Sequence, residues 1–200
     1  MSENNLSREN LKAVLFDMDG TLISPEEHSS LLEFKARWGI APEQLVIPNL
    51  SKLPADAYHG FIELEASLAQ HGVIRPGVTD LLQTLNARGV KTALVTNNSI
   101  ESAETVMAKY ALNFDAVLTR DSAPMKPAPD MLLQALELLG VDASNAVMIG
   151  DTAADSGAAI KAQVQHCYLL SEPWNVALEG QGVTRVTDFA ALQTALLELM

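Results

Sequence analysis

Residues 12–22 have the sequence KAVLFDMDGTL, in which a short apolar run ends on two acids and a glycine. The run has the length and composition of a strand buried on both faces, as in a parallel sheet. If the strand continues through the acids, Asp17 and Asp19 point the same way, because alternate side chains share a face. Two such carboxylates repel, so one is protonated or a cation lies between them. The alternative is an ordinary strand-end turn, where Asp and Gly are both common.

Five further runs predict the rest of the sheet. They lie at residues 91–96, 115–119, 145–151 and 165–170, with 183–186 as a short edge strand. Helical patterns separate them; Leu132, Leu136 and Leu139, for example, share a face before a stop at Gly140. Strands that alternate with helices predict an α/β protein with a doubly wound parallel sheet.

One stretch, residues 24–73, breaks this alternation. It has no convincing buried strand, and residues 26–38 and 55–70 have the apolar spacing of helices. At the other end of the chain, Thr187 and Asp188 offer a cap for a helix that runs to Met200. We therefore expect a core domain of residues 10–23 and 74–200, a small helical module of residues 24–73, and a flexible N-terminus of residues 1–9.

A second pair of acids follows the run at residues 145–151. Asp151 is expected at the edge of the sheet where ligands bind, and Asp155 near the start of the next helix. Alone, this pair is better explained as a helix N-cap and a first-turn acid, both favoured by the helix dipole. Collected with Asp17 and Asp19 at one edge, the carboxylates would be costly without a cation. Carboxylate oxygens favour Mg²⁺, and no Cys or His spacing suits zinc.

Two weaker signals lie between these acids. Thr96 and Asn97 end the run at residues 91–96 and carry hydrogen-bond donors for phosphate oxygens. Lys126 stands before Pro127 and Pro129, which restrict the local backbone. Turn residues and loop lysines are common, so neither signal alone indicates a phosphate-binding site.

Composition restricts the class of partner. The 200 residues include 13 Lys and Arg against 25 Asp and Glu, a formal net charge of −12. This excess argues against nucleic-acid and anionic-membrane partners, but not against a small anionic substrate met by a local cluster.

The single cysteine, Cys167, and a polar start without a signal core predict a cytoplasmic protein. The apolar runs are too short to span a bilayer. The sequence leaves the oligomeric state open, with a monomer or weak dimer as a guess, because no sustained heptad demands a partner chain.

Four of these segments, in order, resemble the motifs of the haloacid dehalogenase-like (HAD) hydrolase superfamily. They are Asp17-Met-Asp-Gly-Thr21, Thr96, Lys126-Pro-Ala-Pro129 and Gly150-Asp-Thr-Ala-Ala-Asp155. The helical module is similar to the C1 cap of the phosphoglycolate phosphatase branch, and Arg75-Pro-Gly-Val78 also resembles that branch. The module is short for the branch, and Ala162-Gln-Val-Gln165 replaces a turn of small residues and glycine that is usual there. The resemblance implies a Rossmann-like core.

The resemblance also implies a function, a Mg²⁺-dependent phosphatase that hydrolyses a small phosphorylated metabolite. It makes Asp17 the nucleophile that forms an aspartyl-phosphate and Asp19 the general acid and base. The implied phosphate-binding groups are the N–H groups of Met18 and Asp19, with Thr96, Asn97 and Lys126. The implied metal ligands are Asp17, the main-chain carbonyl of Asp19 and Asp151, with Asp155 acting through water.

Several alternatives stay open. A phosphosugar mutase of the same superfamily would return the phosphoryl group from Asp17 to a sugar, and a non-catalytic protein would only bind a ligand. A dehalogenase is less favoured because Asp19 supplies an acid–base group, and a phosphonate hydrolase because no cap lysine has a supporting motif. The substrate is not identified. His28, Lys35, Arg37 and Lys52 are candidates to meet an anionic tail, against the alternative of a solvated helix face.

Overall fold

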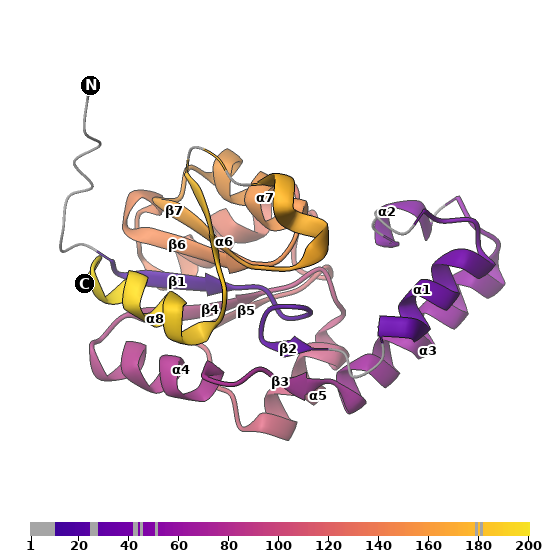
Figure 1. Cartoon of the computed structure of the whole chain (residues 1–200), viewed down its shortest axis with the longest axis horizontal. Helices are drawn as coiled ribbons and strands as arrows, with labels where there is room; N and C mark the ends of the chain where they lie inside the picture. The colour runs from indigo at the N-terminus through magenta and orange to yellow at the C-terminus, as the bar shows by residue number, and fades with distance from the viewer. Residues whose placement is uncertain are drawn as a thin grey trace.

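The fold is described from a computed structural model (Figure 1). It describes residues 11–24, 28–41, 44, 46–50, 52–178, 180 and 182–200. The N-terminus expected to be flexible, residues 1–9, lies outside these ranges.

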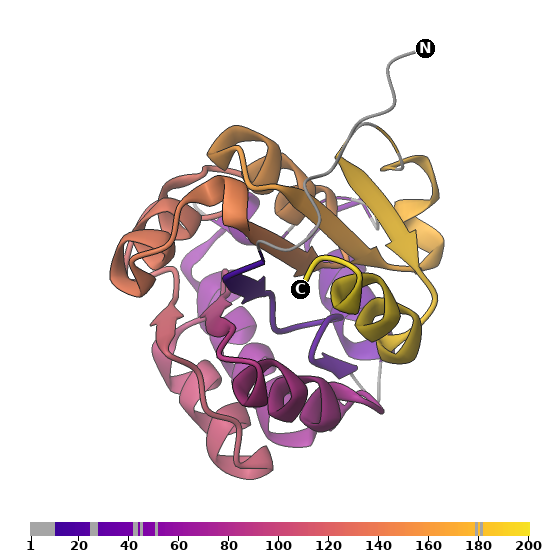
Figure 2. The same ribbon diagram turned by 90° about the vertical axis from the view of Figure 1, so that its left-hand side faces the viewer.

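Six parallel strands form the main sheet, in the spatial order β5–β4–β1–β6–β7–β8 (Figures 1 and 2). The strands are β1 (Ala13–Phe16), β4 (Lys91–Val95), β5 (Ala116–Leu118), β6 (Ala146–Gly150), β7 (His166–Leu170) and β8 (Val183–Val186). Each of the six predicted runs is confirmed within one residue of its expected ends, and β8 is the predicted edge strand.

Helices cover both faces of this sheet, and its central strands β1 and β6 are apolar and buried along their whole length. Val14 and Phe16 of β1 belong to the core under one layer of helices, and Ala13 and Leu15 to the core under the other. The first layer contains α4 (Val78–Ala87), α5 (Ile100–Tyr110) and α8 (Phe189–Leu197), and the second α6 (Asp130–Leu139) and α7 (Ala153–Ala162). The predicted doubly wound α/β fold is confirmed.

The ends of these helices follow local chemistry. Gly140 ends α6 in a left-handed conformation with a φ of 65°. The carboxylate of Asp188 accepts a hydrogen bond from Ala191 N at the start of α8, which ends at Leu197 rather than at Met200. Gln163 ends α7 with a φ of 58°. A non-glycine residue therefore adopts the left-handed conformation in the turn after α7, which costs about 1 kcal/mol.

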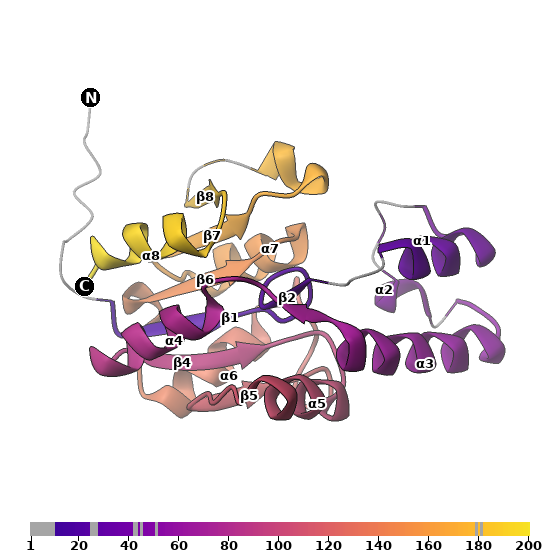
Figure 3. The ribbon, with the colours of Figure 1, turned by 60° about the horizontal axis from the view of Figure 1, so that its bottom comes forward.

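The helical module lies beyond the end of the sheet where β1 leads into the loop before β2 (Figures 1 and 3). Its helices are α1 (His28–Arg37), α2 (Ile47–Leu50) and α3 (Ala55–His71). Phe61 packs with Ile40 and Val46, and Phe34 and Trp38 pack against them. Two of the helices match the predicted ones, although the expected start of the first, at Glu26, lies outside the described residues.

Two strands of two residues each and one single-turn helix were not predicted. A two-stranded antiparallel sheet of β2 (Ile23–Ser24) and β3 (Val73–Ile74) joins the chain where it leaves the core to where it returns. Strands of two residues have no detectable period, and α2 is a single turn.

No helix in the described part of the chain is both long and apolar enough to cross a lipid bilayer.

Candidate active site

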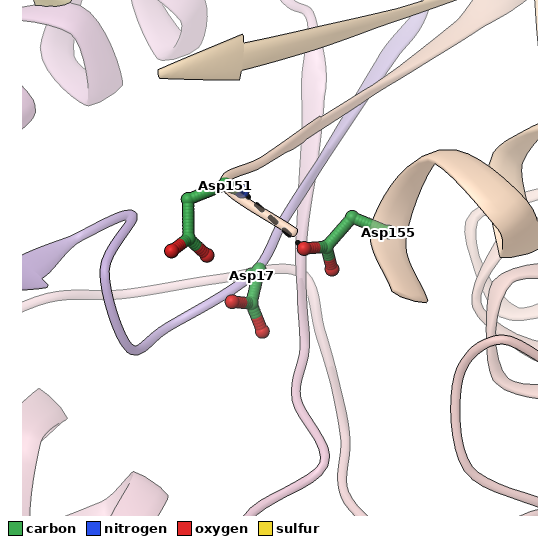
Figure 4. Close-up of side chains that lie close together, drawn as sticks. All are labelled: Asp17, Asp151 and Asp155. Carbon is green, nitrogen blue, oxygen red and sulfur yellow. Dashed lines mark hydrogen bonds between the residues drawn. The ribbon is translucent and has the colours of Figure 1, made fainter. Parts of the chain in front are cut away.

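Three carboxylates meet at one end of the sheet, each from a different element. Asp17 follows β1 and Asp151 follows the neighbouring strand β6, while Asp155 comes from the first turn of α7. One oxygen of each lies within 4.8 Å of the others, and all three residues are buried. Figure 4 shows the side chains converging from these separate segments. The pairing of β1 with β6 therefore brings acids together that are far apart in the sequence.

Two glycines make this close approach possible. Gly20 has a φ of 74°, and a Cβ there would lie 2.3 Å from Oδ2 of Asp151. A Cβ on Gly150 would lie 2.4 Å from the Cβ of Asp155. Both distances are far below van der Waals contact, so each glycine leaves room for one of the acids.

Lys126 is the cation of this cluster. It lies in the loop between β5 and α6 and is 2% exposed. Its Nζ donates to Oδ1 of Asp17 and to Oδ1 of Asp155, both at 2.6 Å. Asn97 holds the Lys126 backbone from both sides, because its Nδ2 donates to Lys126 O and its Oδ1 accepts from Lys126 N, each at 2.9 Å. The Asn97 amide side chain is therefore used to place the lysine.

Asp155 is held in place through its second oxygen. Its Oδ2 accepts from Thr152 Oγ1 at 2.6 Å, from Thr152 N at 3.0 Å and from Asp151 N at 3.3 Å. This is a capping box at the start of α7. Asp155 is therefore the predicted first-turn acid of α7 and also a partner of Lys126, whereas the N-cap is Thr152 and not Asp151.

Asp19 lies outside the group of three. β1 ends at Phe16, and Met18 O accepts hydrogen bonds from the N–H groups of Thr21, Leu22 and Ile23, so the chain turns instead of continuing as a strand. The Asp19 carboxylate accepts a hydrogen bond from Asn98 Nδ2. The turn therefore begins directly after the first acid, and the roles of the Asp19 carboxylate and of its carbonyl as a metal ligand stay predictions.

The remaining predicted residues surround the cluster. Thr96 is 1% exposed, and its Oγ1 accepts from Asn98 N at 3.1 Å. The Met18 side chain is buried in the core. Among the described residues, the N–H groups of Met18 and Asp19 have no acceptor within the protein.

Burial governs ionisation in this site. It raises the pKa of Asp17 to about 7, against the opposing effect of Lys126 and with added repulsion from Asp155. It also raises the pKa of Asp151 well above the ordinary value, and Asp155 and Asp17 raise it further. Burial acts in the other direction on Lys126, but the carboxylates of Asp155 and Asp17 outweigh it and raise the pKa of the ammonium group. One firm positive charge therefore faces three acids.

The site fits a divalent cation. Oδ1 of Asp151 is buried and, within the described part of the chain, has no hydrogen-bond partner. An unpaired carboxylate oxygen beside two further carboxylates supplies the hard oxygen ligands that such ions prefer. A cation there would balance the charge that Lys126 leaves uncompensated.

Two polar residues that sequence reasoning missed connect the site to the rest of the molecule. Glu65 of α3 is 4% exposed; its Oε1 accepts from Ser99 N and its Oε2 from Arg120 Nη1, both at 2.7 Å. Asn175 is fully buried, and its Nδ2 donates to Asp151 O at 2.8 Å and to Leu170 O at 2.7 Å. No local pattern in the sequence marks either residue.

Replacing Asn175 tests whether it positions Asp151. Its Oδ1 also accepts from Arg185 Nε at 3.0 Å, so Asn175→Ala leaves several buried groups unpaired. We expect a stability loss of about 1–3 kcal/mol per unpaired group. If the site holds a divalent cation, its affinity, probed with Mg²⁺, should be lower by about 10–100-fold. Calorimetric titration of the folded variant, beside the exposed Asn86→Ala on α4, measures the affinity. Unchanged Mg²⁺ affinity in a destabilised variant would limit Asn175 to a structural role.

Comparison with known proteins identifies the family of this chain. Residues 11–163 match the family model for haloacid dehalogenase-like hydrolases. The chain therefore belongs to the haloacid dehalogenase-like hydrolase family.

Relatives within the family carry phosphatase names. The chain is 30% identical over 180 residues to N-acetylmuramic acid 6-phosphate phosphatase of Pseudomonas aeruginosa, covering 75% of this chain and 77% of the relative. It is 25% identical over 166 residues to phosphoglycolate phosphatase of Aquifex aeolicus, covering 72% of this chain and 78% of the relative. A HAD-superfamily hydrolase from Ehrlichia chaffeensis shares the fold, with a TM-score of 0.69 and 21% identity over 96% of this chain and 99% of that one.

Proposed function

We propose that this enzyme is a Mg²⁺-dependent phosphatase that hydrolyses a small phosphate monoester through an aspartyl-phosphate on Asp17. The observation that carries the proposal is the contact between Asp17 Oδ1 and Lys126 Nζ within the group of three carboxylates. The names of the two relatives described above specify different phosphate monoesters. They therefore support phosphate ester hydrolysis as the reaction but do not identify the alcohol of this enzyme's substrate.

Asp17 is the nucleophile in this mechanism. Its carboxylate attacks phosphorus in line, the bond from phosphorus to the leaving oxygen breaks, and a mixed anhydride forms on Asp17. Only the ionised carboxylate attacks, and burial raises its pKa to about 7. Lys126 favours the ionised form and reduces the repulsion between Asp17 and the incoming phosphate.

Asp19 is the general acid and base. Burial raises its pKa to about 6, against the hydrogen bond from Asn98, and the charge of Glu65 raises it further. A carboxyl with a pKa near neutrality can first donate a proton to the leaving oxygen and then remove one from the attacking water. That water attacks phosphorus, the bond from phosphorus to the Asp17 oxygen breaks, and inorganic phosphate leaves. Asn98 orients this carboxyl through its contact with Oδ2.

The phosphoryl group is held mainly by backbone donors. The N–H groups of Met18 and Asp19 and the Thr96 hydroxyl bind its oxygens, and Lys126 adds a positive charge. Asn97 contributes by placing Lys126, as described above. Mg²⁺, when bound, supplies Lewis-acid stabilisation of charge on the phosphoryl oxygens. Asp17, Asp151 and the Asp19 carbonyl would hold it, with Asp155 orienting the site.

The proposal extends to the whole molecule. Residues 24–73 act as a cap over a core of residues 10–23 and 74–200, and exclude water when closed. The substrate is a small phosphorylated metabolite, and the enzyme works in the cytoplasm.

Hydrolysis of a chromogenic aryl phosphate tests the reaction. We expect turnover with Mg²⁺ and a loss of at least about 100-fold after chelation, because a catalytic cation contributes several kcal/mol. Readdition of Mg²⁺ should restore the rate, and Ca²⁺ serves as a control for ionic strength. Turnover that survives complete chelation would contradict the proposal. A rate that requires an added sugar bisphosphate would instead favour the mutase alternative.

A further inference from the structure

A cavity of about 120 Å³ lies beside Asp19, between the helical module and the core. Its walls are mostly apolar: Ile23 from β2, Leu31 from α1, and Phe61 and Leu68 from α3. The polar residues that line it are Asp19, Glu65 and Asn98. Because Asp19 is the proposed donor of a proton to the leaving oxygen, this cavity is where the alcohol part of the substrate would lie.

The polar groups of the cavity are already engaged. Asn98 Nδ2 donates to Asp19, and both oxygens of Glu65 accept hydrogen bonds, from Ser99 N and from Arg120. A substrate group that enters therefore meets apolar surface and two acids. A carboxylate or second phosphate would lose its hydration there without a cation among the described lining residues to compensate, which is strongly unfavourable.

Glu65 also fixes the shape of the cavity. It joins α3 to the loops after β4 and β5 through its contacts at 2.7 Å to Ser99 and Arg120. Phe61 and Leu68 lie four residues before and three residues after Glu65, on the same face of the helix. The ion pair therefore fixes the position of Phe61 and Leu68, both part of the apolar wall, relative to Asp19.

None of the described cations of the helical module lines this cavity. The Arg37 guanidinium lies over the Trp38 ring, 5.4 Å from its centre, and Lys52 Nζ donates to Asn49 Oδ1 at 3.3 Å. Lys35 is likewise not among the lining residues, and the His28 side chain lies outside the described part of the chain. Arg37 is exposed on α1, which fits the alternative of a solvated helix face, and Lys52 is exposed in the turn between α2 and α3.

We propose that the alcohol released by this enzyme is small, uncharged and mainly apolar, and not one that carries a carboxylate or second phosphate. This inference rests on the proposed phosphatase function. The size follows from the volume, because an apolar cavity of about 150 Å³ holds one benzene molecule. The cavity beside Asp19 therefore admits a group of about that size, comparable to a short branched alkyl chain or one ring.

Two nearly isosteric esters test the inference. The phosphate esters of 3-methylbutanol and 3-hydroxypropanoate differ mainly in an uncharged isopropyl end against a carboxylate end. We expect kcat/KM to be at least about 100-fold higher for the 3-methylbutyl ester, a difference of about 2.7 kcal/mol. Equal or faster hydrolysis of the carboxylate ester would overturn the inference.

A matched pair of variants then locates the effect. Leu31→Lys places a cation in the cavity wall, whereas Leu32→Lys changes the neighbouring residue on α1, which is 45% exposed. We expect Leu31→Lys to reduce the preference for the uncharged ester by at least about 10-fold and Leu32→Lys to leave it unchanged. The same preference in both variants would show that the cavity does not bind the alcohol and would overturn the inference.

A chromogenic aryl phosphate separates this inference from the proposed function. Mg²⁺-dependent hydrolysis of the aryl ester without a preference between the two alkyl esters, or without turnover of either, overturns the inference alone. Failure to hydrolyse the aryl ester, or hydrolysis that does not need Asp17, overturns the proposed function and the inference with it.

Discussion

Asp17→Asn is expected to lower kcat for phosphate ester hydrolysis by about 10⁴-fold or more, because it removes the nucleophile. Asparagine has nearly the same shape as aspartate, so its amide oxygen can still accept from Lys126 Nζ, the partner of Asp17 Oδ1 at 2.6 Å. The variant also removes one of three buried acids. We therefore expect the metal-free protein to be at least as stable as the native one, so that loss of activity is not loss of folding.

Two measurements check this expectation. Steady-state kinetics give kcat, and mass spectrometry after rapid acid quenching detects a phosphoryl group on the native enzyme and none on Asp17→Asn. Asp142→Asn is the control, because Asp142 is exposed and its carboxylate makes no cap hydrogen bond. A phosphoryl adduct that persists in Asp17→Asn would assign the nucleophile to another residue.

Lys126→Met is expected to reduce both activity and stability. Lys126 is the cation closest to Asp17, and loss of one electrostatic donor of this kind lowers kcat by about 10²–10³-fold. Its removal also leaves the carboxylates of Asp17 and Asp155 buried without their partner, which costs about 3–5 kcal/mol when both are ionised.

The stability loss should depend on pH. Burial raises the pKa of Asp17 to about 7 even beside Lys126, so in the metal-free native protein the contribution of Asp17 to stability falls as the pH rises from about 4 to 7. Without Lys126 the pKa of Asp17 rises further, and ionisation at higher pH becomes more costly. We therefore expect a small difference between variant and native protein at pH 5.5 and a large one at pH 8.

Denaturant unfolding in the presence of a chelator measures this difference. Lys91→Met is the control, because Lys91 pairs with Asp115 at 3.0 Å, but the two side chains are 53% and 38% exposed. An exposed pair contributes no more than about 1 kcal/mol. A loss for Lys126→Met that equals the Lys91→Met loss, or that does not change with pH, would contradict the buried ion-pair network.

The local parts of the structure were predictable, and the failures have local causes. The strands could be found because each is a short apolar run, and α6 because its stripe ends at a glycine. The hairpin of β2 and β3 could not, because two residues define no period. The turn after Asp19 could not be predicted either, because it depends on hydrogen bonds from three N–H groups to Met18 O.

Some residues of the candidate site could likewise be predicted from the sequence, and others could not. Asp17, Asp151, Asp155 and Lys126 could be proposed from motifs, whereas Asn98, Glu65, Arg120 and Asn175 could not. Lys126 and Asp17 are 109 residues apart, and Glu65 and Arg120 are 55 apart, so packing decides whether they touch. Asn97 shows the difference most clearly: its position after β4 predicted a phosphate contact, and its side chain instead holds the Lys126 backbone.

From its sequence alone, this chain is a parallel α/β protein with acids at the ends of two strands, because apolar runs, helix stops and motif residues act over a few positions. Only the tertiary structure decided which oxygens have partners, which acids share Lys126, and which residues line the cavity beside Asp19. Those properties depend on distances between segments that are remote in the sequence. Such distances are set when the sheet pairs β1 with β6 and α3 attaches to the core through Glu65.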